Sequence, residues 1–390
     1  MYIQQAFKNL HEWWRYLVGF LIIFIASQIG SIPLLIGVVY KVLAEGGDIS
    51  TIENPDVLMN TLSANLTLFL MLFSFAVGLL ALYLIVKYLH NQKFLKLTTT
   101  RNKTDWGRVF FGFGLITITT LVVTYLDYNA NPDDYEWQFQ LVPFIILAVI
   151  AIVMIPLQTS FEEYLFRGYL MQGIGVSTFN KKFPFVLIYL FVAAGVYYFL
   201  TQYFIVEGTD HLLILILIVM ILMFTVNSKY IDSLLKTEAY TKWYRAFTSR
   251  ATPLIITSVV FGGLHLANPE VDKFGNIIMI YYIGTGFFLG IMTLMDEGME
   301  LALGFHAGNN LITAVLVTAD WTVFKTPSLL KDISDPTAGF DVLAPVLIIY
   351  PIFLLIMAWR YKWTDWGGKL FGRVTQPVEI TAEVTTPENI

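Results

Sequence analysis

Long apolar runs separated by short polar breaks follow one another along the 390-residue chain. About 20 consecutive apolar residues are enough to cross the hydrocarbon core of a bilayer as an α-helix. The pattern predicts ten such helices, at about 17–40, 62–86, 109–126, 141–160, 184–204, 212–226, 253–268, 276–295, 301–319 and 342–359. The sixth helix, at 212–226, is short for a transmembrane helix. We therefore expect an all-α polytopic membrane protein with about ten transmembrane helices, and eight at the fewest.

The composition agrees with a membrane protein. Charged residues make up 14% of the chain and hydrophobic residues 56%, whereas a soluble domain has about 25% charged residues. Cysteine is absent, which excludes disulfides, thiol nucleophiles and thiolate zinc sites. The net charge of −5 gives no basic surface for nucleic acid. The lipid bilayer is thus an expected partner, and nucleic acid is not.

The positions of the cations predict the orientation of the chain. Threading ten helices assigns every loop to one side of the membrane. All Lys and Arg residues then fall on the side of the two termini, except Lys41, Lys273, Lys325 and Lys331. Because basic loops are retained on the inner side, we expect both termini to be cytoplasmic in an integral multi-pass protein of the cell membrane.

The fourth helix ends in two adjacent carboxylates, Glu162 and Glu163, followed by Arg167. Ionisable residues at membrane depth are costly and indicate function by default. Glu163 and Arg167 are four residues apart, so they can form an ion pair on one helix face. This pair would leave Glu162 without a partner and available for proton chemistry.

Two of the five histidines, His265 and His306, fall well inside predicted helices. His306 and Asn310 share a helix face, and Phe261 and His265 repeat the same spacing. A rise of about 1.5 Å per residue places all these groups between the midplane and the cytoplasmic boundary. Taken alone, each segment also fits a structural role: a charged helix end for Glu162, or a hydrogen-bonded interior side chain for His265.

The three segments together resemble the CAAX protease and bacteriocin-processing family of intramembrane endopeptidases, also called the CPBP or Abi family. Its motifs read EExxxR, FxxxH and HxxxN, in that order. Here they are complete, as Glu162-Glu163-x3-Arg167, Phe261-x3-His265 and His306-x3-Asn310. The resemblance is to CAAX prenyl proteases in particular and covers about 141–319.

The resemblance implies a catalytic role for Glu162, His265, His306 and Asn310, with Glu163, Arg167 and Phe261 in support. Glu162, oriented with His265, would activate a water for attack on a peptide carbonyl. His306 and Asn310 would then donate hydrogen bonds to the oxyanion. The substrate would be a membrane-associated peptide or protein near the cytoplasmic face, which in the best-known relatives has a lipidated C-terminus.

The cofactor is left open by the sequence. Family members are commonly labelled metalloproteases, and Glu162, His265 and His306 could form a two-histidine, one-carboxylate zinc site with an open position for water. A metal-free mechanism driven by the glutamate has also been proposed for the family. Both versions use the same residues.

The resemblance also suggests a division of the chain. Residues 1–140 would hold the first three transmembrane helices, and 141–319 the catalytic core with an inserted segment at about 186–250. Residues 320–373 would form a loop and the last transmembrane helix. The polar segment 374–390 is expected to be disordered.

Two other functions are compatible with the sequence. One is a non-catalytic membrane scaffold or immunity protein on the same fold. The other is a proton-coupled transporter, because buried Glu and His side chains also form proton relays. A transporter would be expected to contain inverted repeats, and no convincing internal repeat is present.

Overall fold

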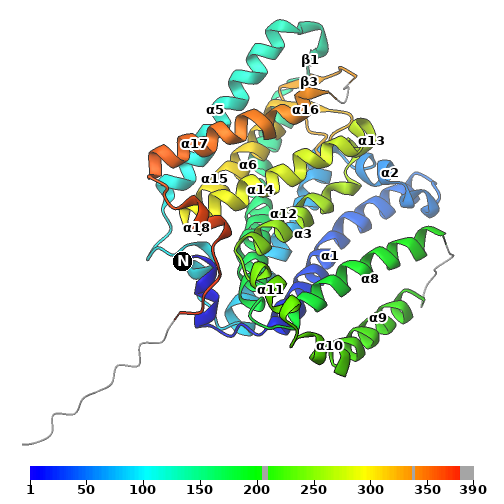
Figure 1. Cartoon of the computed structure of the whole chain (residues 1–390). Coiled ribbons are helices and arrows are strands. Elements are labelled where there is room, and N and C mark those ends of the chain that lie inside the picture. Colours follow the sequence, from blue (N-terminus) through cyan, green and yellow to red (C-terminus); the bar gives the residue numbers. More distant parts are fainter. Residues whose placement is uncertain (204–209, 336–338, 378–390) are drawn as a thin grey trace, which may run out of the picture.

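The computed structural model describes residues 1–203, 210–335 and 339–377, and helices dominate it (Figure 1). In these ranges seven helical segments are long and apolar enough to cross a membrane. Three of these segments are single helices: α1 (Trp13–Ala44), α5 (Trp106–Ala130) and α8 (Phe183–Tyr203). Two contain a π-helix after an α-helix: α3 with η3 (Ala64–Leu84, Ile85–Leu89), and α6 with η5 and then α7 (Leu141–Glu163, Tyr164–Leu170, Met171–Ser177). The last two are α13, η7 and α14 (Pro269–Phe274, Gly275–Ile277, Ile278–Asp296), and α16, the π-helix η8 and α17 (Phe340–Ala344, Pro345–Ile349, Tyr350–Tyr361).

Each of the ten predicted segments contains a helix. The three outside the long set are α9 (Asp210–Val226), α12 with the 3₁₀ turn η6 (Ala251–Gly263, Leu264–Ala267) and α15 (Glu300–Leu316). The all-α polytopic fold is thereby confirmed, and the exact number of spans stays a prediction. Of the expected disordered tail, residues 378–390 lie outside the described residues.

Short elements cap the two ends of the bundle. One end carries η1 (Ile3–Lys8), α4 (Phe94–Thr98), α10 (Lys229–Leu234), α11 (Glu238–Phe247) and α18 (Trp366–Phe371). The other carries η2 (Ile49–Glu53), α2 (Pro55–Asn60), η4 (Pro132–Asp134) and a small sheet of β1 (Tyr135–Trp137), β3 (Leu330–Asp332) and β2 (Val317–Ala319). In this sheet β3 is central, antiparallel to β1 and parallel to β2.

Loops that the sequence assigns to one side do meet at one end. Thr99 forms a β-bridge with Gly298, and Gln4 Nε2 donates to Thr375 Oγ1 at 2.6 Å. The sheet joins two connections assigned to the opposite side, because β1 precedes α6 and both β2 and β3 follow α15. The described parts near both termini therefore lie at the same end, and the positive-inside rule predicts that this end is cytoplasmic.

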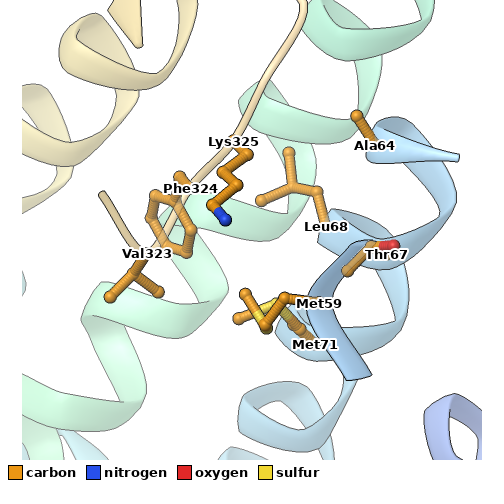
Figure 2. Close-up of a pocket in the computed structure, with 8 residues that line it drawn as sticks. All are labelled: Met59, Ala64, Thr67, Leu68, Met71, Val323, Phe324 and Lys325. Carbon is orange, nitrogen blue, oxygen red and sulfur yellow. The ribbon is translucent and has the colours of Figure 1, made fainter. Parts of the chain in front are cut away.

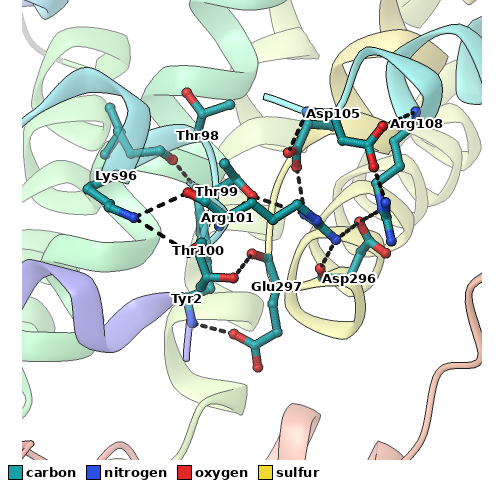
Figure 3. A network of polar contacts seen from close by, with 12 residues as sticks. Tyr2, Lys96, Thr98, Thr99, Thr100, Arg101, Asp105, Arg108, Asp296 and Glu297 are labelled. Carbon is teal, nitrogen blue, oxygen red and sulfur yellow. Dashed lines mark hydrogen bonds and ion pairs between the residues drawn. The ribbon is translucent and has the colours of Figure 1, made fainter. Parts of the chain in front are cut away.

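A buried ionic network ties this end together (Figure 3). Asp296 Oδ2 lies 2.8 Å from Arg101 Nη2 and 2.9 Å from Arg108 Nε. Arg101 Nη1 also lies 3.0 Å from Glu300 Oε2, the first residue of α15. The Asp296 and Glu300 side chains are almost fully buried, and these cations compensate their charge. The network fixes the first turn of α15, and His306 follows on the second.

The bundle is centred on α6, which packs against α3 and α15, while α1 packs on α3 and α12 on α14. The α5–α15 crossing is especially close because glycines remove side chains from it. A Cβ at Gly304 would lie 1.8 Å from the carbonyl oxygen of Val109, and one at Gly112 would lie 2.5 Å from that of Leu301.

Gly304→Ala is therefore expected to separate α5 from α15 and lower the free energy of unfolding by about 1–3 kcal/mol. Gly114→Ala is the matched control, because a Cβ there meets no atom within 4 Å and alanine is the better helix former. Unfolding in mixed detergent micelles measures both variants. Equal stability of the two would contradict the close crossing.

The segment predicted as an insertion forms a peripheral hairpin of α8 and α9 (Figure 1). Tyr189 Oη donates to the Ile218 carbonyl at 2.7 Å between the two helices. The hairpin packs on the bundle through a small cluster that includes Phe183, Val186 and Leu222. Most of its other apolar side chains face outward, as lipid contact requires.

Candidate active site

The first motif lies where α6 passes into the π-helix η5. Arg167 Nη1 donates to Glu163 Oε1 at 3.0 Å, and both side chains are buried. Arg167 Nη2 donates to the Gly286 carbonyl at 3.3 Å, and its guanidinium carbon lies 4.2 Å from the centre of the Phe261 ring. The ion pair expected from the spacing is thus present, and it joins α6 to α12 and α14.

His306 lies between the two carboxylates of the first motif. Its Nδ1 is 2.8 Å from Glu163 Oε1, and its Nε2 is 3.4 Å from Glu162 Oε2. Because Arg167 already donates to Glu163 Oε1, this oxygen is an acceptor, and the proton of the hydrogen bond to His306 lies on Nδ1. The neutral ring then presents Nε2 as an acceptor, so His306 can donate to an oxyanion only when the ring carries two protons.

Glu162 does have a partner, contrary to the expectation from the spacing alone. Gln158 Nε2 donates to Glu162 Oε1 at 2.7 Å, from one turn earlier on α6. Asn310 Nδ2 donates to Gln158 Oε1 at 3.2 Å, and it lies 3.5 Å from His306 Nε2. The Glu162 side chain is 13% exposed. One oxygen of Glu162 is therefore held, and the other faces His306.

The second motif brings His265 to this group through an aromatic ring. His265 Nδ1 is hydrogen-bonded to the Phe261 carbonyl at 2.8 Å, which leaves Nε2 free to accept in the neutral ring. The Phe261 ring centre lies 4.9 Å from that of His265 and 6.1 Å from that of His306. The Phe261 side chain therefore lies next to both imidazoles.

Two residues of this neighbourhood were not among those expected from the sequence. Gln158 could have been found, because it is a lone amide at membrane depth four residues before Glu162. The Tyr282 ring stacks on His265, with ring centres 4.4 Å apart and planes inclined by 24°. Nothing in the sequence around Tyr282 indicates this contact.

A metal ion has no ready-made ligand set in the described part of the chain. No group of three or more His, Cys, Asp or Glu side chains there is placed to hold one. Glu162, His265 and His306 have suitable donor chemistry, but their donor atoms do not converge on one point. The zinc hypothesis accordingly gains no support from the geometry, and the chemistry below is derived from the side chains.

A small pocket lies apart from the motif residues, between α3 and the chain that leads to β3 (Figure 2). Its lining is mainly apolar: Met59, Ala64, Thr67, Leu68, Met71, Val323, Phe324 and Lys325. It contains no acidic or imidazole group.

Comparison with known proteins agrees with the motifs. Residues 234–312 match the family model described as type II CAAX prenyl endopeptidase Rce1-like. The match contains the second and third motifs and begins after the first. It confirms the resemblance to the CAAX protease family.

The chain is also 24% identical over 321 residues to YyaK of Bacillus subtilis strain 168, which is described as an uncharacterized protein. The similar region covers 81% of this chain and 82% of YyaK. No solved structure matches the chain.

Proposed function

From the Rce1-like domain at residues 234–312, we propose that the protein is a CAAX-type intramembrane endopeptidase. It hydrolyses a peptide bond of a membrane-associated peptide or protein near the cytoplasmic face. One observation carries the proposal: two helices far apart in sequence, α6 and α15, bring a carboxylate, an imidazole and an amide together. Glu162 Oε2 lies 3.4 Å from His306 Nε2, and Asn310 Nδ2 lies 3.5 Å from the same nitrogen.

Glu162 is the general base in this proposal. It takes a proton from water while the water oxygen bonds to the peptide carbonyl carbon. Gln158 holds one oxygen of Glu162, so the other is the one that meets the water. His265 Nε2, free because Nδ1 is bonded to Phe261, helps to orient that water. The proton then passes from Glu162 to the leaving nitrogen as the C–N bond breaks.

The developing oxyanion needs donors. Asn310 supplies an amide N–H, and His306 Nε2 supplies a second when its ring is doubly protonated. Glu163 and Arg167 act indirectly, because Glu163 fixes the His306 ring through Nδ1 and Arg167 compensates the buried Glu163 charge. No step in this reaction scheme requires a metal. Zinc on Glu162, His265 and His306 stays a separate hypothesis.

A cleavage assay tests the proposal. The purified protein is reconstituted in vesicles and given a prenylated peptide ending in a CAAX-type sequence, with the same peptide lacking the prenyl group as the matched substrate. We expect mass spectrometry to detect a single cleavage that depends on Glu162. Faster cleavage of the prenylated peptide would support a lipidated substrate, and equal rates would favour membrane peptides in general.

The same assay separates the rival functions. Binding of these peptides and of a panel of transmembrane peptides without any cleavage would contradict the protease and support the scaffold or immunity role. Proton flux into the vesicles without cleavage would support the transporter, since Glu163, His306 and Glu162 lie in a row that could relay protons.

A further inference from the structure

Gln158 is a buried amide on α6, at the point where the long apolar part of this helix ends. Its residue is 4% exposed, and the hydrogen-bonding capacity of its side chain is used on both sides. An amide at this depth is costly unless both its ends are paired. Its partners are Glu162 and Asn310, which belong to different helices and to different motifs.

The direction of these hydrogen bonds is fixed by chemistry. An ionised carboxylate only accepts, so the Gln158 nitrogen must face Glu162 and the Gln158 oxygen must face Asn310. Asn309 Nδ2 donates to Asn310 Oδ1 at 3.1 Å, which turns the Asn310 nitrogen toward Gln158. The chain of donors therefore runs one way, from Asn309 through Asn310 and Gln158 to Glu162.

Because the hydrogen bonds run in this direction, the two N–H groups of the Asn310 amide have different roles. One N–H donates to Gln158 Oε1. The second points toward His306 Nε2 and the space beside it. At the other end, the bond to Oε1 restrains rotation of the Glu162 carboxylate and keeps Oε2 next to His306. The Gln158 side chain thus orients both the Glu162 carboxylate, which is the proposed base, and the Asn310 amide, which is the proposed oxyanion donor.

We propose that Gln158 is a positioning residue that couples the Glu162 carboxylate to the Asn310 amide across the contact between α6 and α15. The proposal rests on the proposed endopeptidase function. Gln158 does not meet the substrate. It preorganises two groups that do, and donors preorganised toward developing charge usually make the largest single contribution to catalysis.

Gln158→Met tests the coupling, because methionine has nearly the same shape without either hydrogen bond. We expect kcat for peptide cleavage to fall about 10–100-fold, as when a supporting partner of a catalytic group is lost, with KM within about twofold. The acidic limb of the pH–rate profile should move to higher pH, since the ionised Glu162 has lost a donor. Thr159→Val is the matched control: Thr159 is buried next to Gln158, and its hydroxyl bonds only backbone carbonyls.

Gln158→Glu supplies a rescue that a merely structural role would not show. The introduced carboxylic acid, while protonated, can still donate to Glu162 and accept from Asn310, so activity near the wild-type value is expected at the acidic end of the range. As pH rises and this proton is lost, two carboxylates face each other and cleavage should fall much more steeply than in the wild type. The variant also keeps the experiment decisive if Gln158→Met does not fold.

The outcomes separate the two proposals. If Glu162→Gln is inactive while both Gln158 variants keep the wild-type kcat and pH profile, the positioning role is overturned and the protease stands. If wild-type protein cleaves but Glu162→Gln cleaves equally well, the proposed mechanism fails first. A double variant Gln158→Met with Asn310→Ala should lose less than the product of the single losses, and independent losses would contradict the coupling.

Discussion

Glu162→Gln is expected to reduce peptide cleavage by about a thousandfold or more, because general-base catalysis contributes roughly 10²–10⁴-fold and an amide cannot take the proton from water. The replacement keeps the size of the side chain, and its amide oxygen can still accept from Gln158. The fold and detergent stability should therefore stay close to those of the wild type. Initial rates over a range of substrate concentrations measure the effect.

Glu238→Gln provides the control for this experiment. The Glu238 side chain is 84% exposed, and its one ion pair in the part of the chain that the structure describes is with Lys242 on the surface of α11, so its loss should leave the cleavage rate unchanged. A Glu162→Gln protein that hydrolyses the peptide at the wild-type rate would exclude Glu162 as the base.

Arg167→Met is expected to have the largest effect on stability, lowering the free energy of unfolding by about 3–5 kcal/mol. It leaves the Glu163 charge inside the bundle with only His306 as a partner. Within the described residues Glu163 Oε2 already has no hydrogen-bond partner. Unfolding titrations in mixed micelles measure the loss.

The double variant Glu163→Gln with Arg167→Met shows whether the stability lost in Arg167→Met comes from the unpaired Glu163 charge or from the altered packing. Removing both charges should restore much of the stability, because an unpaired buried charge costs more than a missing pair. Activity should not return, since His306 Nδ1 no longer faces a carboxylate. If the double variant is as unstable as Arg167→Met alone, the ion pair is not what stabilises this part of the fold.

The helices were predictable because a bilayer enforces them. A backbone in hydrocarbon must satisfy its own hydrogen bonds, so an apolar run of sufficient length becomes a helix whatever its neighbours are. The sheet of β1, β2 and β3 was not predictable. Each strand has three residues, and pairing such as that of Tyr135 with Asp332 depends on contacts far along the chain.

In the candidate site, too, contacts within one helix were predictable from the sequence and contacts between helices were not. The Glu163 and Arg167 pair is local to one helix, so its spacing was sufficient to predict it. The position of His306 between two carboxylates depends on how α15 packs against α6, which the sequence does not encode locally. The expectation that Glu162 has no partner was wrong, because it considered only charged side chains as partners. The partner is the neutral amide of Gln158.

The π-helix that follows Glu163 has a consequence for how sequence variation should be interpreted. A π turn contains more residues than an α turn, so loss of one residue between Tyr164 and Leu170 could be absorbed as an ordinary α-helix. The segment would keep its hydropathy and its helical content. If the lost residue lies between Glu163 and Arg167, however, their separation falls from four residues to three, and Arg167 takes a different position around the helix relative to Glu163. A deletion that leaves the hydropathy profile unchanged would therefore still alter the ion pair between Glu163 and Arg167.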